Sequence, residues 1–353
     1  MTRPSLTLLW AVRSHCASHR CRYCYFGEGE GEGDGQAAAS SAPGVLSHLS
    51  PDDLTAAEAL SFAATLGRSA VRRVFLAGGE PLLWRPMSSL IEVLKGQGME
   101  VVVCTSGVAL ARPQVSAMLV QLGVDAVSVS LDSADPAHHD AWRPPKQPGE
   151  GWDRVIDGVR ALLAARSARP RPRVGLYSVI TALNIPDVCA VPRLAASLGC
   201  DYAVPQPVAL PLDHKLSAQL SLTAQHLPAL REQFTALYGE TLPVRLPAAS
   251  YPGQVTAAVA EPTGTVAGCF GGHTLFFAEP DGSVWDCPST LRIAATPARA
   301  RRNIRGADAA ALFPAPRGPA GDCPLFSVDC VNMWPLAGFA SMLEPAFTAG
   351  GPQ

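Results

Sequence analysis

Three cysteines lie close together near the start of the chain, in the stretch CASHRCRYCYF. Cys16, Cys21 and Cys24 are separated first by four residues and then by two. Clustered thiolates of this kind hold either an iron–sulfur cluster or a zinc ion, and His15 or His19 would complete a tetrahedral zinc site. The spacing of the cysteines leaves both kinds of metal site open.

A second group of four cysteines lies in the last quarter of the chain. Two of them bracket a predicted hairpin in which the strands HTLFFA and VWDC flank the turn EPDGS. Four thiolates can ligate every iron of a cubane cluster, or one structural zinc ion. The members of this group are Cys269, Cys287, Cys323 and Cys330. The other three cysteines lie in apolar segments and are predicted to be small buried side chains: Cys104, Cys189 and Cys200.

Composition and charge argue against a nucleic-acid-binding protein, a membrane protein and a secreted protein. A chain of 353 residues with 48% apolar content can bury a large core, and a net charge of −2 provides no basic footprint for nucleic acid or an anionic membrane. The arginines between positions 292 and 305 lack interleaved aromatic residues and are interpreted as a solvated face. The apolar run from Leu6 to Val12 is followed by basic residues rather than a cleavage site, which favours a buried strand over a signal peptide. We therefore expect a cytoplasmic protein with no membrane segment and no nucleic-acid partner.

Apolar strands and amphipathic helices alternate along the first half of the chain. Six such strand–helix units fit between residues 5 and 206, and a helix is predicted from Ser50 to about Gly67. Strands of this near-continuous apolar type form parallel sheets covered by helices, with ligands at the carboxyl ends of the strands. The predicted fold is α/β, a partial (β/α)6 TIM-like barrel. Residues 27–48 are rich in Gly, Glu, Ala and Ser and are predicted to be a flexible insertion.

Polar motifs follow the predicted strands where ligands are expected. The cysteine loop follows the first strand, GGEP (Gly78–Pro81) the second, TSG (Thr105–Gly107) the third, and SLDS (Ser130–Ser133) the fourth. This set resembles the radical S-adenosylmethionine (SAM) superfamily over roughly residues 5–205. The resemblance implies a [4Fe–4S] cluster held by the three early cysteines, with one iron left to bind SAM. Reductive cleavage of SAM then gives a 5′-deoxyadenosyl radical, which takes a hydrogen atom from the substrate.

The same resemblance assigns roles to the motif residues. Tyr23 would pack on the adenine, the backbone at Gly78 and Gly79 would approach the cofactor, and Glu80 would accept a hydrogen bond from the SAM ammonium. Arg143 would pair with the SAM carboxylate, because its guanidinium binds that group in a bidentate manner. The residues expected at the ribose are Ser106, Ser130 and Asp132, the last of which could instead face the substrate.

The second cysteine group resembles the C-terminal extension called SPASM, or its shortened form called twitch. Four cysteines in this extension imply one auxiliary [4Fe–4S] cluster in a small α+β domain built on the hairpin. The division expected from these features is a radical SAM barrel at 1–210, a linker with a helix at 211–262, the auxiliary domain at 263–345 and a tail at 346–353.

The resemblance also frames the expected reaction. Related enzymes modify peptides or small molecules, and only fifteen residues precede Cys16, which leaves no room at this end for a leader-binding domain. We therefore expect an oxidoreductase, epimerase or lyase that acts on a small polar natural-product intermediate by dehydrogenation, epimerisation or decarboxylation, with an electron donor such as flavodoxin or ferredoxin. A radical SAM maturase of a ribosomally made peptide is the alternative. In a different class of protein, the alternative is a zinc-bound structural or nucleic-acid-binding protein.

Overall fold

The computed structural model describes residues 6–24, 52–210, 214–261, 264–315, 319–324 and 328–344. The predicted insertion at 27–48 and the predicted tail at 346–353 lie outside these ranges.

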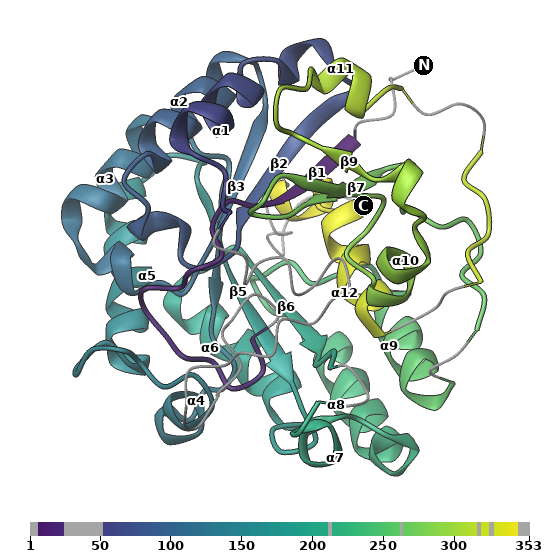
Figure 1. Cartoon of the computed structure of the whole chain (residues 1–353). Coiled ribbons are helices and arrows are strands. Elements are labelled where there is room, and N and C mark those ends of the chain that lie inside the picture. The colour runs from purple at the N-terminus through teal and green to yellow at the C-terminus, as the bar shows by residue number, and fades with distance from the viewer. Residues whose placement is uncertain are drawn as a thin grey trace, which may run out of the picture.

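One nine-stranded sheet organises the chain, in the order β6-β5-β4-β3-β2-β1-β7-β8-β9 (Figure 1). Strands β1 to β6 are parallel to their neighbours and follow one another in chain order. Because β6 and β9 end the sheet without pairing, the barrel is open, which confirms the predicted partial (β/α)6 barrel. The bounds of the six strands are β1 Leu6–Ala11, β2 Val71–Ala77, β3 Glu100–Thr105, β4 Ala126–Ser130, β5 Arg173–Ile180 and β6 Tyr202–Pro207.

The two faces of the sheet are covered by different parts of the chain. Successive side chains of a strand point to opposite faces, so in β1 Leu8 and Trp10 pack against the helices, whereas Leu9 and Ala11 pack against C-terminal residues that include Phe339. Figure 1 shows the first three helices together along one side of the sheet. The barrel helices are α1 Ala56–Ala63, α2 Met87–Gly96, α3 Pro113–Gln121, α4 Pro136–Trp142, α5 Trp152–Arg166 and α6 Asp187–Leu198.

The first helix begins later than the sequence predicts. Helix α1 starts after Thr55, which forms a reciprocal capping box with Glu58, and Ser50 lies outside the described residues. The helix also ends at Ala63, before the predicted end at Gly67. Asp53, which falls within the predicted helix, lies before α1 and accepts a hydrogen bond of 3.1 Å from the backbone N–H of Ser14, next to the cysteine loop.

The C-terminal segment extends the barrel sheet. Strand β7 (Leu275–Ala278) pairs in parallel with β1, and the predicted hairpin is completed by β8 (Ser283–Trp285), which is antiparallel to β7. Strand β9 (Arg302–Asn303) pairs with β8. The division of the chain into domains stays a prediction. The helices of this half are α7 Ser217–Leu220, α8 Leu227–Gly239, α9 Tyr251–Ala260, α10 Thr290–Ala295, α11 Ala309–Leu312, α12 Val328–Ala337 and α13 Ala340–Leu343.

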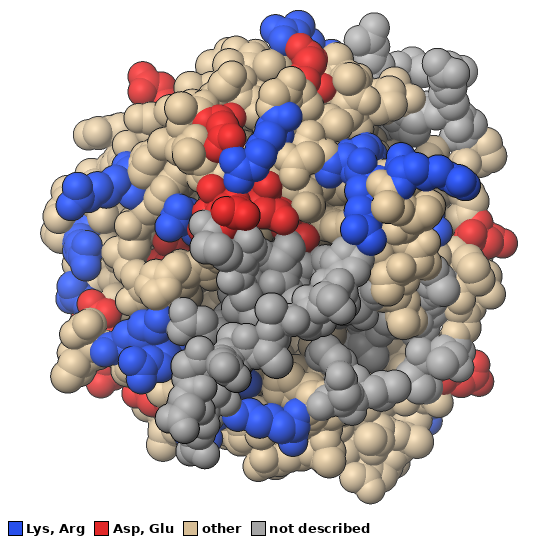
Figure 2. All heavy atoms as spheres, in the orientation of Figure 1, with Lys and Arg blue, Asp and Glu red and all other residues tan. Residues whose placement is uncertain are grey.

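Charged groups on the visible face are interspersed (Figure 2). Arg292 and Arg302 both pair with Asp286, at 3.4 and 2.6 Å, and Arg305 pairs with Glu58 at 2.6 Å. Three of the arginines between 292 and 305 therefore form ion pairs with carboxylates of their own chain. None of the helices in the described ranges is both long and apolar enough to cross a membrane.

Candidate functional site

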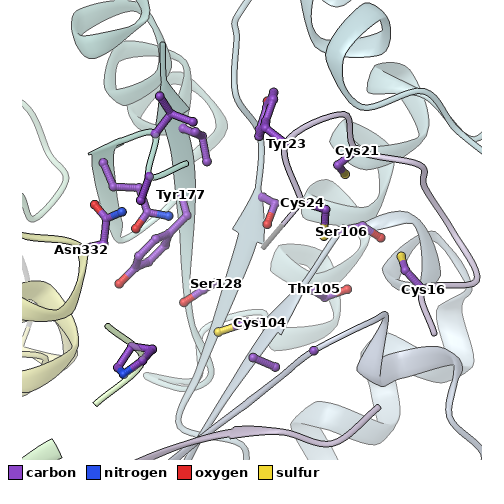
Figure 3. Close-up of a pocket in the computed structure, with 18 of the residues that line it drawn as sticks. Cys16, Cys21, Tyr23, Cys24, Cys104, Thr105, Ser106, Ser128, Tyr177 and Asn332 are labelled. Carbon is purple, nitrogen blue, oxygen red and sulfur yellow. The ribbon is translucent and has the colours of Figure 1, made fainter. Parts of the chain in front are cut away.

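A cavity of about 280 Å³ lies at the carboxyl ends of the barrel strands. Cys16, Cys21 and Cys24 all line it, and Figure 3 shows them on the loop that follows β1. The other predicted site residues that line the cavity are Tyr23, Gly78, Gly79, Ser106, Ser130 and Arg143. The predicted residues Glu80 and Asp132 are not among its lining residues; both are buried behind it.

The two glycines after β2 make room for the cysteine loop. Both have positive φ, +81° at Gly78 and +47° at Gly79. A Cβ at Gly78 would lie 2.7 Å from the Ala11 Cβ, and one at Gly79 would lie 2.2 Å from the carbonyl oxygen of His15. Approach to the cofactor was the role predicted for these glycines. The structure gives them an additional one, because only glycine lets the start of the cysteine loop pack against this turn.

Glu80 joins the ends of β2 and β3. One carboxylate oxygen accepts from the backbone N–H of Leu82 at 3.1 Å and from Thr105 Oγ1 at 2.8 Å. The other accepts from the backbone N–H and the hydroxyl of Ser106, at 2.7 and 2.5 Å. A carboxylate has about four acceptor sites, so its bonds within the chain already use all of them. A SAM ammonium can reach Glu80 only by displacing one donor, and the rotatable hydroxyl of Ser106 is the one most easily displaced.

A serine that sequence reasoning missed links this carboxylate to the cysteine loop. Ser18 is fully buried, and its hydroxyl donates to Ser106 Oγ at 3.1 Å and lies 3.4 Å from Cys16 Sγ. The ring of His19 contacts the same hydroxyl through Nδ1 at 3.1 Å. The cysteine spacing alone gives no signal for this residue, because serine is common in any loop.

Asp132 anchors two other predicted site residues. It is fully buried and accepts hydrogen bonds from the Tyr23 hydroxyl, from Arg143 Nε and, at 2.9 Å, from the backbone N–H of Val179. Burial acts to raise the pKa of Asp132, but the Arg143 guanidinium, His139 and the hydrogen bonds from Tyr23 and Val179 together outweigh it and hold the pKa below its usual value. In the structure Asp132 is fully buried and positions Tyr23 and Arg143, and its expected contact with the ribose or the substrate stays a prediction.

Arg143 comes to the cavity because α4 ends just before it. Asp135 caps this helix by accepting from the backbone N–H of Ala137 at 3.0 Å, and Pro136 occupies the first helical position. With its Nε directed at Asp132, Arg143 donates through Nη1 to Cys21 Sγ at 3.6 Å. Burial raises the pKa of the Cys21 thiol to about 11, against the influence of this guanidinium. A metal therefore has to displace the thiol proton when it binds.

The cavity continues past the predicted residues towards α12. Cys104, which was predicted to be a small buried side chain, lines it at the end of β3. Burial raises the pKa of this thiol to about 12, and the nearby Glu80 charge acts in the same direction, so the thiol stays protonated. Further polar lining on this side comes from residues that the sequence analysis above did not name as site residues: Ser128, Tyr177, Gln206 and Asn332.

The second cysteine group lies together at another cavity. Cys269, Cys287 and Cys323 line a space of about 310 Å³, and Cys330 is buried in α12. Burial raises the pKa of Cys287 to about 12, and the nearby Cys330 acts in the same direction. The backbone N–H of Gly271 points at Cys269 Sγ at 3.3 Å. Backbone donors of this kind are typical around cluster thiolates.

The thiols of the first group lie around a cavity, which fits a cluster better than a single ion. In the part of the chain that the structure describes, no three His, Cys, Asp or Glu side chains are grouped so that they could hold one metal ion. A zinc site needs its ligands about 2.0–2.3 Å from one ion, whereas a cubane gives each thiolate an iron of its own. Thiols spread around a cavity are therefore suited to a cubane.

The two cysteine groups flank the first cavity. Pro288, directly after Cys287, lines that cavity, and so does Asn332, two residues after Cys330 on α12. A molecule held in the cavity therefore lies between the loop that carries the first group and the residues that adjoin the second.

Comparison with known proteins identifies the first half of the chain. The family model described as the radical SAM superfamily matches residues 13–184. A GTP 3′,8-cyclase of Rhodopseudomonas palustris is 37% identical over 135 residues, which cover 36% of each chain. GTP 3′,8-cyclase 2 of Mycobacterium tuberculosis is 31% identical over 190 residues, 53% of this chain and 49% of the relative. The aligned stretches thus span half or less of the length of these relatives.

Solved structures share the fold over most of the chain. The structure described as native anSMEcpe with bound AdoMet has a TM-score of 0.61 at 17% identity and covers 88% of this chain and 80% of its own. Streptococcus suis SuiB bound to S-adenosylmethionine also has a TM-score of 0.61, at 13% identity, and covers 87% of this chain and 65% of its own. At such identities the likeness establishes the fold alone.

Proposed function

We propose that the protein, whose residues 13–184 match the radical SAM superfamily, is a radical SAM enzyme that dehydrogenates a small, uncharged polar metabolite. The observation that carries this proposal is that the first cavity is lined both by the first cysteine group and by Pro288 and Asn332, which lie within two residues of members of the second group in the sequence. When bound, a cluster on the first group together with SAM supplies a 5′-deoxyadenosyl radical, and an auxiliary cluster on the second group supplies a one-electron acceptor. An acceptor at the far end of the cavity favours net oxidation over epimerisation or decarboxylation.

The chain's own residues would bind and orient these groups. Cys16, Cys21 and Cys24 would hold the first cluster, and the second would be held by the group around Cys287. Arg143, fixed by Asp132, is placed to meet a carboxylate. The protonated thiol of Cys104 and the neighbouring strand ends would then form the wall of the space that remains for the substrate.

The charge of the cavity favours a neutral substrate. Among the lining residues in the described ranges, the basic side chains are those of Arg143 and His19. Burial lowers the pKa of His19 to about 3, with Arg143 acting in the same direction, so its ring is neutral. Arg143, paired with Asp132, is the cation assigned above to the SAM carboxylate, which leaves no second cation among these residues for the substrate. Phosphate groups are normally bound by several cationic or N–H donors.

GTP cyclisation is a second candidate, because the aligned GTP 3′,8-cyclases are 31% to 37% identical to this chain. The scarcity of cations among the described lining residues makes GTP the poorer fit. We also propose a cytoplasmic location, since clusters and free thiols persist in reducing compartments. The reductant of the first cluster would be a flavodoxin or ferredoxin.

The test uses anaerobically reconstituted, reduced protein incubated with SAM. We expect 5′-deoxyadenosine to form, and to form faster with neutral hydroxylated metabolites than with GTP or peptides. Replacing Cys16, Cys21 and Cys24 together by Ala should abolish 5′-deoxyadenosine and leave one cluster's worth of iron. Persistent SAM cleavage in that variant would overturn the assignment of the first group, and stimulation by GTP alone would favour cyclisation.

A further inference from the structure

Two polar side chains lie on the side of the cavity away from the first cysteine group. In Figure 3, Tyr177 and Asn332 lie on one side of the view and Cys16 on the other. Tyr177 comes from β5 and Asn332 from α12, and both line the same cavity. The hydrogen-bonding atoms of these two side chains determine which chemical groups can bind on this side of the cavity.

Asn332 presents a buried acceptor. Its Nδ2 donates to the carbonyl oxygen of Pro207 at 3.0 Å, which fixes the orientation of the amide. The Oδ1 atom is therefore the other end of the amide, and it is buried and accepts no hydrogen bond from any residue in the described ranges.

Tyr177 presents a buried donor. Its ring lies edge-on to Tyr202, with 6.3 Å between the ring centroids. Burial raises the pKa of Tyr177 well above its usual value, and Tyr202 acts in the same direction, so the phenol stays protonated. The hydroxyl of Tyr202 bonds to Ser128 Oγ at 2.9 Å, whereas that of Tyr177 has no partner among the described residues.

The acceptor of Asn332 and the donor of Tyr177 together favour a ligand that carries both a hydrogen-bond donor and an acceptor. A buried polar atom without a partner costs free energy, so a ligand that satisfies both atoms recovers that cost. Asn332 Oδ1 needs an N–H or O–H, and the Tyr177 hydroxyl can donate to an oxygen. A carboxylate or phosphate dianion supplies no donor for the amide oxygen, and an ammonium supplies no acceptor for the phenol. The adjoining lining residues are uncharged: Gln206, Pro207, Val208, Pro288 and Leu336.

We propose that Tyr177 and Asn332 form a substrate subsite that binds a neutral group with a hydrogen-bond donor beside an acceptor, a hydroxyl or an amide. The subsite rests on the proposed function for its place in the reaction, because it lies in the cavity where substrate is held. It deepens that proposal by stating which group of the substrate lies farthest from the first cysteine group.

Probe binding tests the subsite without any need for SAM cleavage. Full-length reconstituted protein is titrated by saturation-transfer NMR with myo-inositol, with N-acetylglycine N-methylamide and with inorganic phosphate. We expect at least one neutral probe to bind, and Tyr177→Phe and Asn332→Leu each to weaken that probe by about tenfold, equivalent to about 1.4 kcal/mol. The first two probes distinguish hydroxyl recognition from amide recognition.

A matched control is available in Tyr251, whose buried hydroxyl also has no partner among the described residues but which packs in a different apolar cluster, outside the cavity. Tyr251→Phe should bind the neutral probe as the wild type does. If Asn332→Leu fails to fold, Tyr177→Phe decides alone, since it removes one oxygen atom. The subsite is refuted if neither neutral probe binds the wild type, if Tyr177→Phe binds it unchanged, or if phosphate binds more tightly. Failure of the wild type to form 5′-deoxyadenosine would instead refute the proposed function.

Discussion

Glu80→Gln separates two roles of the carboxylate that joins β2 to β3. The side chain accepts four hydrogen bonds within the chain, two of them from the backbone N–H groups of Leu82 and Ser106. A glutamine has one oxygen, so its NH2 group must face one of these backbone donors whichever way the amide is turned. A buried donor left without an acceptor costs about 1–3 kcal/mol. We therefore expect the variant to lose about 2 kcal/mol of folding free energy, together with some affinity for SAM.

Thermal unfolding measures the first effect and calorimetric titration with SAM the second. At about 2–4 °C per kcal/mol for a domain of 150–250 residues, the melting temperature should fall by a few degrees. Glu92→Gln, at an exposed position of α2, is the control and should leave both quantities unchanged. A Glu80→Gln protein that melts like the wild type but binds SAM poorly would refute the reasoning, because the four bonds would then contribute nothing to folding.

Three further outcomes are expected. Gly79→Ala places a methyl group 2.2 Å from the His15 carbonyl oxygen at a φ of +47°. The variant should lose about 3 kcal/mol or more of folding free energy and bind less iron at the first cysteine group. Wild-type iron content and a wild-type melting temperature would contradict this. Ser18→Ala removes the hydroxyl that lies 3.4 Å from Cys16 Sγ. A cluster-bound thiolate can only accept, so in the wild type this hydroxyl would turn its hydrogen from Ser106 to the sulfur; its loss should lower the reduction potential of the first cluster in a potentiometric EPR titration, whereas an unchanged or higher potential would rule out tuning by this hydroxyl. Cys323→Ala should lose iron from the second group and protease resistance in the C-terminal segment while SAM still binds; an intact proteolysis pattern would show that the metal does not support this part of the fold.

Local sequence patterns predicted the barrel because each strand carries its own signal. The apolar runs and the polar residues after them identify the strand ends, and hence Cys16, Glu80 and Ser106 as neighbours. The first helix was placed too early because Ser50 and Pro51 form a start signal, while the capping box of Thr55 and Glu58, five residues on, determines the observed start.

The sequence patterns could not predict which side chains from distant parts of the chain contact one another. Asp132 follows β4 as expected, yet whether its side chain meets a ligand or its own chain depends on Tyr23 and Arg143, which come from other elements. In the sequence, Tyr177 is indistinguishable from any other residue within a strand. Asn332 reaches the cavity only because α12 packs beside β6. The available signal was its position, two residues after Cys330 of the second cysteine group.

The pairing of β7 with β1 also bears on how the protein can be divided. Every residue of β1 is buried, and its backbone is paired with β2 on one side and with β7 on the other. A fragment that ends before β7 would turn this apolar strand into an unprotected sheet edge, a template for intermolecular pairing. The barrel therefore needs its C-terminal segment to cover the edge of β1, and the two halves are expected to be produced, purified and inherited as one unit.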